Sequence, residues 1–183
     1  MEFPGKKYGI IYADPPWHYR DKASSGKRGV CFKYEVQSHD WVCNLPVKTI
    51  SDTDCILFLW ITMPKLNEVM EVIESWGFKY KTCAFTWVKK NRKKPTWFMG
   101  MGSWTRANTE LCLLATKGNP RRVSASVLSV IDSPLERHSK KPDIIRDKIV
   151  ELCGDLPRIE LFAREKVPDW DYWGNDVGVS SAP

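Results

Sequence analysis

The sequence lacks several features that mark common classes of protein. None of its six cysteines forms a CxxC pair, so the sequence predicts neither a metal site nor a disulfide framework. The longest apolar run covers residues 55–61, far short of the roughly 20 residues that a membrane-spanning helix needs. The first residues resemble neither a signal peptide nor a transit peptide. We therefore expect a cytoplasmic protein without a metal and without a membrane segment.

Internal repeats and low-complexity tracts are also absent. The 183 residues, 43% of them apolar, suit one domain with a proper core. The formal net charge is +6, which favours an anionic partner, nucleic acid first and an acidic membrane second. Nine tryptophans are many for this length and could offer aromatic faces to a planar ligand as well as fill a core.

Short apolar runs alternate with amphipathic segments along the chain. Strands are predicted at residues 8–13, 55–61, 82–88, 111–116 and 158–163, and helices at residues 64–76 and 142–153. Gly77 and Gly154 are placed to end the two helices. This alternation predicts an α/β fold around a mostly parallel sheet, which binds ligands at the carboxyl ends of its strands.

The tetrapeptide Asp14-Pro15-Pro16-Trp17 directly follows the first predicted strand. Asp-Pro is ordinary chemistry for a turn that ends a strand, so the motif alone does not require a function. It also suits one reaction well. The exocyclic N6 amine of adenine is a poor nucleophile, because its lone pair is delocalised into the ring. A carboxylate and a carbonyl that accept its two N–H bonds would restore a lone pair aimed at an electrophilic methyl group.

In that interpretation, Asp14 supplies the carboxylate and Pro15 the carbonyl. Pro15 and Pro16 fix the backbone, so the acceptors are aimed before the substrate arrives. Trp17 offers a face on which the extruded base can stack, worth about 1–3 kcal/mol. All four residues are candidate catalytic residues.

A DPPW motif after an apolar strand resembles the amino-methyltransferases with the signature [DNS]-P-P-[YFW]. Further segments resemble, in the same order, the family of the catalytic subunit that writes N6-methyladenosine in eukaryotic messenger RNA. These segments are residues 56–62, 87–90, 110–120, 138–143 and 158–164. The resemblance covers nearly the whole chain and is strongest to the short bacterial and phage members, which modify DNA.

The resemblance implies a Rossmann-like methyltransferase fold in circularly permuted motif order, with the catalytic motif first. It implies a single domain over residues 1–183, with a core at about 8–177 and a tail at 178–183. It also implies S-adenosylmethionine as cofactor and the N6 amine of adenine as acceptor, in DNA rather than RNA because the sequence has no appended RNA-binding module. RNA, cytosine N4 and a protein side-chain amide are the alternative acceptors. The chain could instead be a non-catalytic nucleic-acid-binding subunit, and a homodimer or a heterodimer with a related subunit is expected.

The family's cofactor-binding positions can be carried over residue by residue. They fall at Ala13, Asp14, Lys141, Arg164, Lys166, Asn175 and Asp176. Glu165-Lys166 stand where family members often have His-Asn, so Lys166 departs from the family's pattern, and Asp176 has a shorter side chain than is usual at its position. Lys141 lies near a helix start, where a lysine also calls for a local anion.

A basic and aromatic stretch follows the third predicted strand. It predicts a nucleic-acid-binding loop, in which cations meet phosphates and aromatic rings stack on bases, although a solvated charge run would look similar. The candidate substrate-binding residues are Lys89, Lys90, Arg92, Lys93, Lys94, Trp104, Arg106 and Glu110, together with Trp17 and with Tyr34 in the loop after DPPW.

Overall fold

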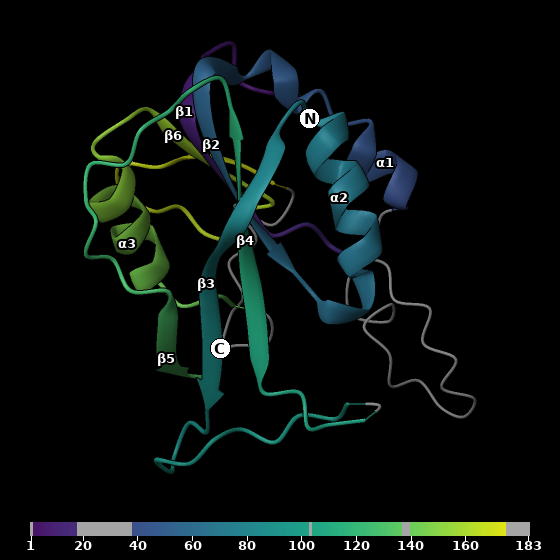
Figure 1. Cartoon of the computed structure of the whole chain (residues 1–183), viewed down its shortest axis with the longest axis vertical. Coiled ribbons are helices and arrows are strands. Elements are labelled where there is room, and N and C mark those ends of the chain that lie inside the picture. The colour runs from purple at the N-terminus through teal and green to yellow at the C-terminus, as the bar shows by residue number, and fades with distance from the viewer. Residues whose placement is uncertain (1, 18–37, 103, 137–139, 175–183) are drawn as a thin grey trace.

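Seven strands form one curled sheet that carries the rest of the chain (Figure 1). The computed structural model describes residues 2–17, 38–102, 104–136 and 140–174, and these are the residues discussed below. Across the sheet the order is β5-β3-β4-β2-β1-β6-β7. The strands are β1 Tyr8–Ala13, β2 Ser51–Ile61, β3 Lys79–Lys90, β4 Thr109–Lys117, β5 Val130–Pro134, β6 Arg158–Leu161 and β7 Asp171–Trp173.

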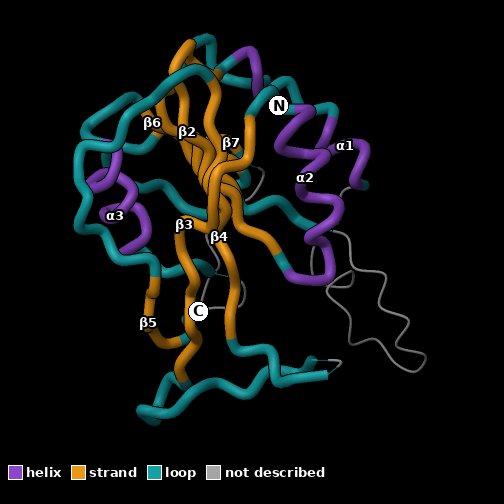
Figure 2. Tube along the Cα trace, viewed as in Figure 1, coloured by secondary structure: helices purple, strands orange, loops and turns teal. Residues whose placement is uncertain are grey.

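Helices cover both faces of this sheet. Figure 2 shows α1 and α2 on one side and α3 on the other. The helices are α1 His39–Cys43, α2 Leu66–Ser75 and α3 Ile144–Cys153, with 3-10 turns at Val47–Thr49 and Met63–Lys65. Gly77 and Gly154 follow α2 and α3 with φ of 84° and 85°, which confirms both predicted helix ends. No described helix is both long and apolar enough to cross a membrane.

The predicted mostly parallel sheet is confirmed, with one exception. β1 pairs in parallel with β2 and β6, β6 with β7, and β3 with β5. β4 runs antiparallel to both of its neighbours, β2 and β3. The chain passes from β3 to β4 through residues 91–108, and the described residues of this segment, 91–102 and 104–108, form no crossover helix. A connection of this kind suits an antiparallel return, which is the direction of β4.

Two apolar layers fill the space between sheet and helices. On the α1 and α2 side, Leu57 and Leu59 of β2 pack with Val69 and Ile73 of α2. On the α3 side, Phe58 and Trp60 of the same strand pack with α3 residues. The alternation of side chains in β2 explains this, because a strand buried on both faces reads as a continuous apolar run. Among the described cysteines, Cys55, Cys112 and Cys153 are buried and free.

Several elements differ from the sequence-based prediction. The observed β2, β3 and β4 are longer than predicted, and β3 takes in Lys89 and Lys90, which the prediction placed in a loop. The last predicted strand ends early, at Leu161, because Phe162 has a φ of 63°. Three short elements, α1, β5 and β7, were not predicted. Each has five residues or fewer, too few to show a period in the sequence.

The topology brings distant segments to one edge of the sheet. β1, β2 and β6 end together there, since Ala13 pairs with both Leu59 and Leu161. Because β4 is reversed, it starts at that edge, where Glu110 lies opposite Trp87 of β3. Residues 91–108, which we call the arm, leave the sheet at the same end and lie below it in Figure 1.

The packing of α3 on the sheet yields a stability prediction. Ile149 is fully buried against the sheet, whereas Ile144 of the same helix is 48% exposed. Ile149→Ala should lower the free energy of unfolding by about 2–5 kcal/mol, because it leaves a cavity in the core. Ile144→Ala, the matched control, should cost less than about 1 kcal/mol. Urea denaturation of both variants checks this, and equal losses would show that α3 does not pack as described.

Candidate active site

The chain turns sharply where β1 ends, and the DPPW motif makes this turn. The backbone N–H of Trp17 donates a hydrogen bond to the Pro15 carbonyl, 2.8 Å away. The indole Nε1 of Trp17 donates to the carbonyl oxygen of Trp60, 3.0 Å away in the buried end of β2. Two prolines and these two bonds fix the backbone, so the direction of the Asp14 side chain is set by the turn.

Four charged side chains gather next to this turn. Lys141, just before α3, places its Nζ 2.7 Å from Oδ2 of Asp14 and 3.3 Å from Oε2 of Glu110. Lys89 from β3 contacts the other oxygen, Oε1, of Glu110. The side chains of Lys141, Asp14 and Glu110 are 13%, 23% and 22% exposed. The four groups form an alternating chain of charges, which we call the Asp14–Lys141–Glu110–Lys89 cluster.

Trp60 forms the floor of this cluster. Its ring centroid lies 5.4 Å from the Lys141 ammonium, and its indole N–H donates to the Tyr12 hydroxyl at 2.7 Å. Trp60 therefore contacts the motif turn, the lysine and β1 at once. A cation over an indole face is stabilised by the ring quadrupole, more strongly when it is partly desolvated. Neither Trp60 nor Tyr12 was predicted from the sequence, although a tryptophan beside the carboxyl end of a buried strand was a signal.

Glu110 and Lys141 keep their charges despite their burial. Burial alone would raise the pKa of Glu110, but the neighbouring Lys141 and Lys89 outweigh it and hold this pKa below its usual value. Burial likewise opposes the charge on Lys141, yet Asp14 and Glu110 raise its pKa above the usual value. The site thus presents a carboxylate and an ammonium in contact at neutral pH.

The loop after β6 lies beside this edge and was predicted to hold cofactor-binding residues. Its start is fixed, because the Ala163 N–H donates to the Trp173 carbonyl at 3.1 Å. Residue 174 must be a glycine because of the same close approach, since a Cβ there would lie 2.6 Å from the Ala163 oxygen. Arg164 follows, exposed, and the Lys166 ammonium lies 5.2 Å from the centroid of the Tyr172 ring. The structure thus brings residue 174 next to Ala163, while Asn175 and Asp176 lie outside the described residues.

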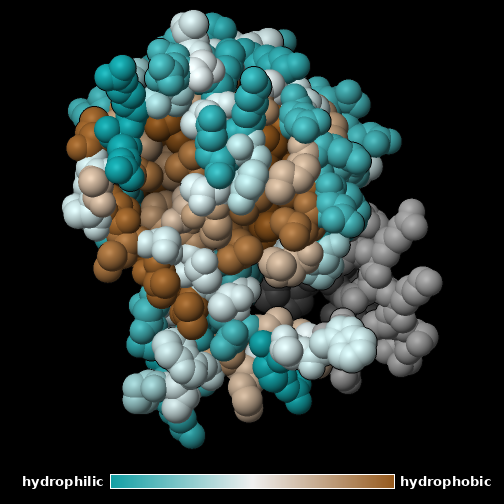
Figure 3. All heavy atoms as spheres, viewed as in Figure 1, coloured by the Kyte–Doolittle hydropathy of each residue, from teal (hydrophilic) through white to brown (hydrophobic). Residues whose placement is uncertain are grey.

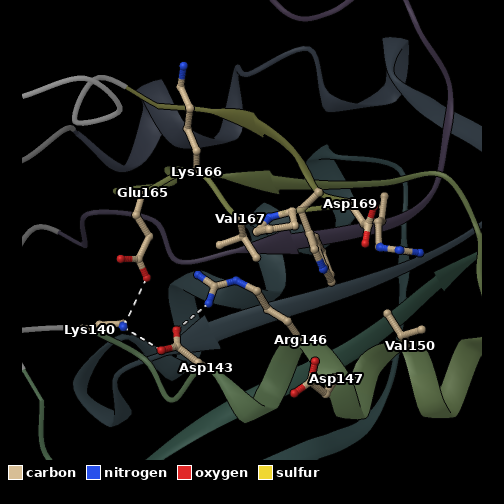
Figure 4. Close-up of a pocket in the computed structure, with 12 residues that line it drawn as sticks. Lys140, Asp143, Arg146, Asp147, Val150, Glu165, Lys166, Val167 and Asp169 are labelled. Atoms are coloured by element: carbon tan, nitrogen blue, oxygen red, sulfur yellow. Dashed lines mark hydrogen bonds and ion pairs between the residues drawn. The ribbon is translucent and has the colours of Figure 1, made fainter.

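A cavity of about 670 Å³ lies between α3 and residues 165–170 (Figure 4). Charged side chains of both signs line it, among them Lys140, Asp143, Arg146 and Glu165. In the figure, Lys166 points away from the other labelled residues of this cavity. Neither Asp14 nor Lys141 lines the cavity, so it adjoins the cluster rather than containing it.

The predicted substrate-binding residues fall into two groups. Internal partners occupy the first: Lys89 contacts Glu110, Lys90 contacts Asp132 at 2.6 Å, and Arg92 Nε donates to the Leu135 carbonyl at 3.0 Å. The second group is exposed on the arm and consists of Lys93, Lys94, Trp104 and Arg106. Trp104 is 99% exposed. In Figure 3 apolar side chains gather between α3 and α2, whereas the arm is mostly teal and pale. Tyr34 lies outside the described residues.

Trp17 is placed differently from its predicted role. An exposed face for a base to stack on was predicted, but the Trp17 side chain is buried in the core, 6% exposed. The physical reason is its indole N–H, which has found a buried carbonyl partner in β2. In this structure Trp17 anchors the turn, and base stacking on it stays a prediction. The described residues contain no group of three or more His, Cys, Asp or Glu side chains that could hold a metal ion.

The curled sheet, its helices on both faces and the motif turn at the carboxyl end of β1 define an α/β methyltransferase-like fold. The family model MT-A70 matches residues 8–176. The chain therefore belongs to the MT-A70 family, a family of Rossmann-like methyltransferases.

Individual relatives agree with this assignment. The chain is 34% identical over 194 residues to the Type II methyltransferase M.MunI of a Mycoplasma species, covering 96% of this chain and 80% of that protein. It is 29% identical over 175 residues to the human N(6)-adenosine-methyltransferase catalytic subunit METTL3, covering 93% of this chain but only 28% of that protein. The Arabidopsis thaliana non-catalytic subunit MTB is 31% identical over 125 residues, covering 66% of this chain and 16% of MTB.

The charged cluster predicts how stability depends on pH. The pKa of Glu110 is lowered by folding, so its contribution is present above its usual value of 4.5 and is lost as the pH falls further. The free energy of unfolding should therefore fall as the pH drops below 4.5, and it should fall less steeply in Glu110→Gln. Urea denaturation at several pH values checks this. Glu151→Gln, which changes an exposed side chain of α3, is the control. If the free energy of unfolding depended on pH identically in wild type and Glu110→Gln, the ion pairs of Glu110 in the cluster would be contradicted.

Proposed function

We propose that this chain transfers a methyl group from S-adenosylmethionine to the exocyclic N6 amine of adenine in DNA. The observation that carries the proposal is the Asp14 carboxylate, held 2.7 Å from Lys141 at the end of the sheet where α/β proteins bind ligands. Membership of the MT-A70 family supports the class of reaction. The carboxylate, the neighbouring carbonyl and the ammonium are the groups that the reaction needs.

The residues present fit this cofactor. The Lys141 ammonium has three donors, and Asp14 and Glu110 accept two of them. One donor therefore remains for the cofactor carboxylate, in a partly buried place over the Trp60 ring. Arg164 and Lys166, on the neighbouring loop, add positive charge for the polar part of the ligand. Asn175 and Asp176 complete the proposed cofactor set, with Ala13 and Asp14 supplying the end of β1.

The motif turn would act on the acceptor amine by position. Oδ1 of Asp14 accepts one N–H of the amine, while Oδ2 stays on Lys141. The Pro15 carbonyl has two lone pairs, of which the Trp17 N–H uses one, so the other can accept the second N–H of the amine. When bound, S-adenosylmethionine would supply the electrophilic methyl group, and its sulfur would take the electron pair of the methyl–sulfur bond as the leaving thioether. The Asp14 carboxylate stabilises the charge that develops on nitrogen and receives the proton that leaves.

Two observations favour DNA over RNA as the substrate. The match to the Mycoplasma Type II methyltransferase covers most of both chains, whereas this chain spans 28% of METTL3. The sequence motifs also resemble the short bacterial and phage members of the family, which modify DNA. RNA adenine is the second candidate acceptor, because METTL3 is named an N(6)-adenosine methyltransferase.

The first test is methylation of matched DNA and RNA oligonucleotides with labelled S-adenosylmethionine, followed by digestion to nucleosides. Wild type should label N6-methyladenine in DNA. Asp14→Ala and Asp14→Asn should lower the rate at least about 100-fold, because the amine loses the charged acceptor that is aimed at it. Asp155→Ala, which removes an ion-paired carboxylate that is 88% exposed, is the matched control and should keep the wild-type rate.

The products separate the alternatives. Label in RNA adenine only would replace the proposed substrate, and label in cytosine would replace the acceptor. Cofactor binding without transfer to any nucleic acid would favour a non-catalytic subunit, as MTB is named.

The arm gives a second prediction about nucleic acid. Lys93 and Lys94 are exposed there, and no contact of either side chain is seen among the described residues. Changing both to alanine should reduce the slope of log affinity against log salt by about 2, because two fewer counterions are released. Lys79→Ala with Lys81→Ala, exposed at the other end of β3, is the matched control. Equal salt slopes in the two double variants would contradict a role of the arm in binding nucleic acid.

A further inference from the structure

Two adjacent lysines before α3 reach different acidic groups. Lys141 contacts Asp14 and Glu110 in the cluster described above. Lys140 instead places its Nζ 2.7 Å from Asp143 and 3.3 Å from Glu165 (Figure 4). Its Nζ also lies 2.9 Å from Glu136. Its side chain is only 19% exposed. Because the two lysines are neighbours in the chain, together they connect the motif turn, the start of α3 and the loop after β6.

A rigid frame lies under Lys140. Arg146 of α3 donates to both oxygens of Glu160 in β6, at 2.7 and 3.2 Å, and to Asp143 at 2.7 Å. The Arg146 and Glu160 side chains are 10% and 14% exposed, so this two-bond pair ties α3 firmly to the sheet. Asp143 accepts from Lys140 as well as from Arg146. Arg146 therefore holds in place the Asp143 carboxylate that Lys140 contacts.

The loop after β6 depends on contacts of this kind. Phe162 and Asp169 bound it, and both have positive φ, 63° and 62°, a conformation that non-glycine residues adopt at a cost. Residues 162–170 contain no helix and no strand. A segment without its own hydrogen-bonded ladder is placed by tertiary contacts, and Glu165 is the member of the loop that Lys140 contacts.

We propose that Lys140 is a positioning residue, whose ion pair with Glu165 holds the Arg164–Lys166 loop at the spacing from Lys141 that the cofactor requires. This inference rests on the proposed function, because it takes Lys141 and the loop as two sides of one cofactor site. Lys140 itself does not contact the cofactor. It fixes one side of the site, while its neighbour Lys141 belongs to the other.

The opposite charges of the two partners make the test specific. Lys140→Gln removes a positive charge and Glu165→Gln removes a negative one. If either residue acted on the cofactor carboxylate only through its charge, the first change would weaken binding and the second would strengthen it. If the ion pair positions the loop, both changes weaken binding, by about fivefold each, a size typical of a partly exposed pair. The double variant should then bind no more weakly than either single variant.

The experiment measures the affinity of the chain for S-adenosylmethionine by calorimetry, with KM and kcat from the methylation assay. The single and double variants should raise the dissociation constant and KM for the cofactor by the same factor, while kcat at saturating cofactor stays within about twofold. Lys140→Arg should restore binding. Glu136→Gln, which removes another carboxylate from Lys140 but lies off the loop, is the matched control and should bind as wild type. Faster amide exchange at residues 164–170 should accompany weaker binding.

The outcomes separate this inference from the proposed function. Tighter binding by Glu165→Gln, additive effects in the double variant, or a loss in Glu136→Gln equal to that in Glu165→Gln would overturn the positioning role while leaving the function intact. Wild-type chain that does not bind S-adenosylmethionine would overturn both. Urea denaturation of each variant shows that it is folded, and if Lys140→Gln fails to fold, Glu165→Gln and Lys140→Arg decide the question.

Discussion

The site depends on one buried ammonium shared by two carboxylates. Lys141 lies between Asp14 and Glu110, over the ring of Trp60. Removing charged groups from water is costly, and the cluster tolerates it because charges of opposite sign alternate at short distances. The contact with Lys141 orients the Asp14 side chain before any substrate arrives. The same lysine keeps a donor for an anionic ligand, so the contact that stabilises the site also prepares it for binding.

The sheet topology makes this contact possible. Asp14 and Lys141 are 127 residues apart in the chain, and Glu110 arrives at the same edge only because β4 is antiparallel to its neighbours. In a fully parallel sheet the start of β4 would lie at the opposite end. The reversed strand also brings the arm out of the sheet beside the motif turn. One topological feature therefore places an acid of the cluster and the proposed nucleic-acid-binding surface on the same side of the molecule.

Aromatic residues hold the parts of the site in register. Trp60 accepts the indole N–H of Trp17 at its carbonyl, supports Lys141 on its ring and donates to Tyr12. The burial of Trp17 thus stabilises the turn that carries Asp14. Across the sheet edge, the Ala163–Trp173 hydrogen bond and the tight approach of Gly174 fix where the post-β6 loop begins. In the candidate site, Asp14, Glu110 and Lys89 stand at strand ends that neighbouring strands constrain.

The sequence by itself determined the strand and helix pattern, the motif at the end of β1 and the family, because apolar periodicity and a short motif are local signals. Pro15 and Pro16 predict their turn from the local sequence alone. Only the tertiary structure decided that Trp17 is buried, that Glu110 belongs beside Lys141 and that Lys140 reaches Glu165. Those outcomes depend on strand direction and on partners far away in sequence. The edge strands β5 and β7 escaped prediction for the same reason, because pairing rather than composition defines such short segments.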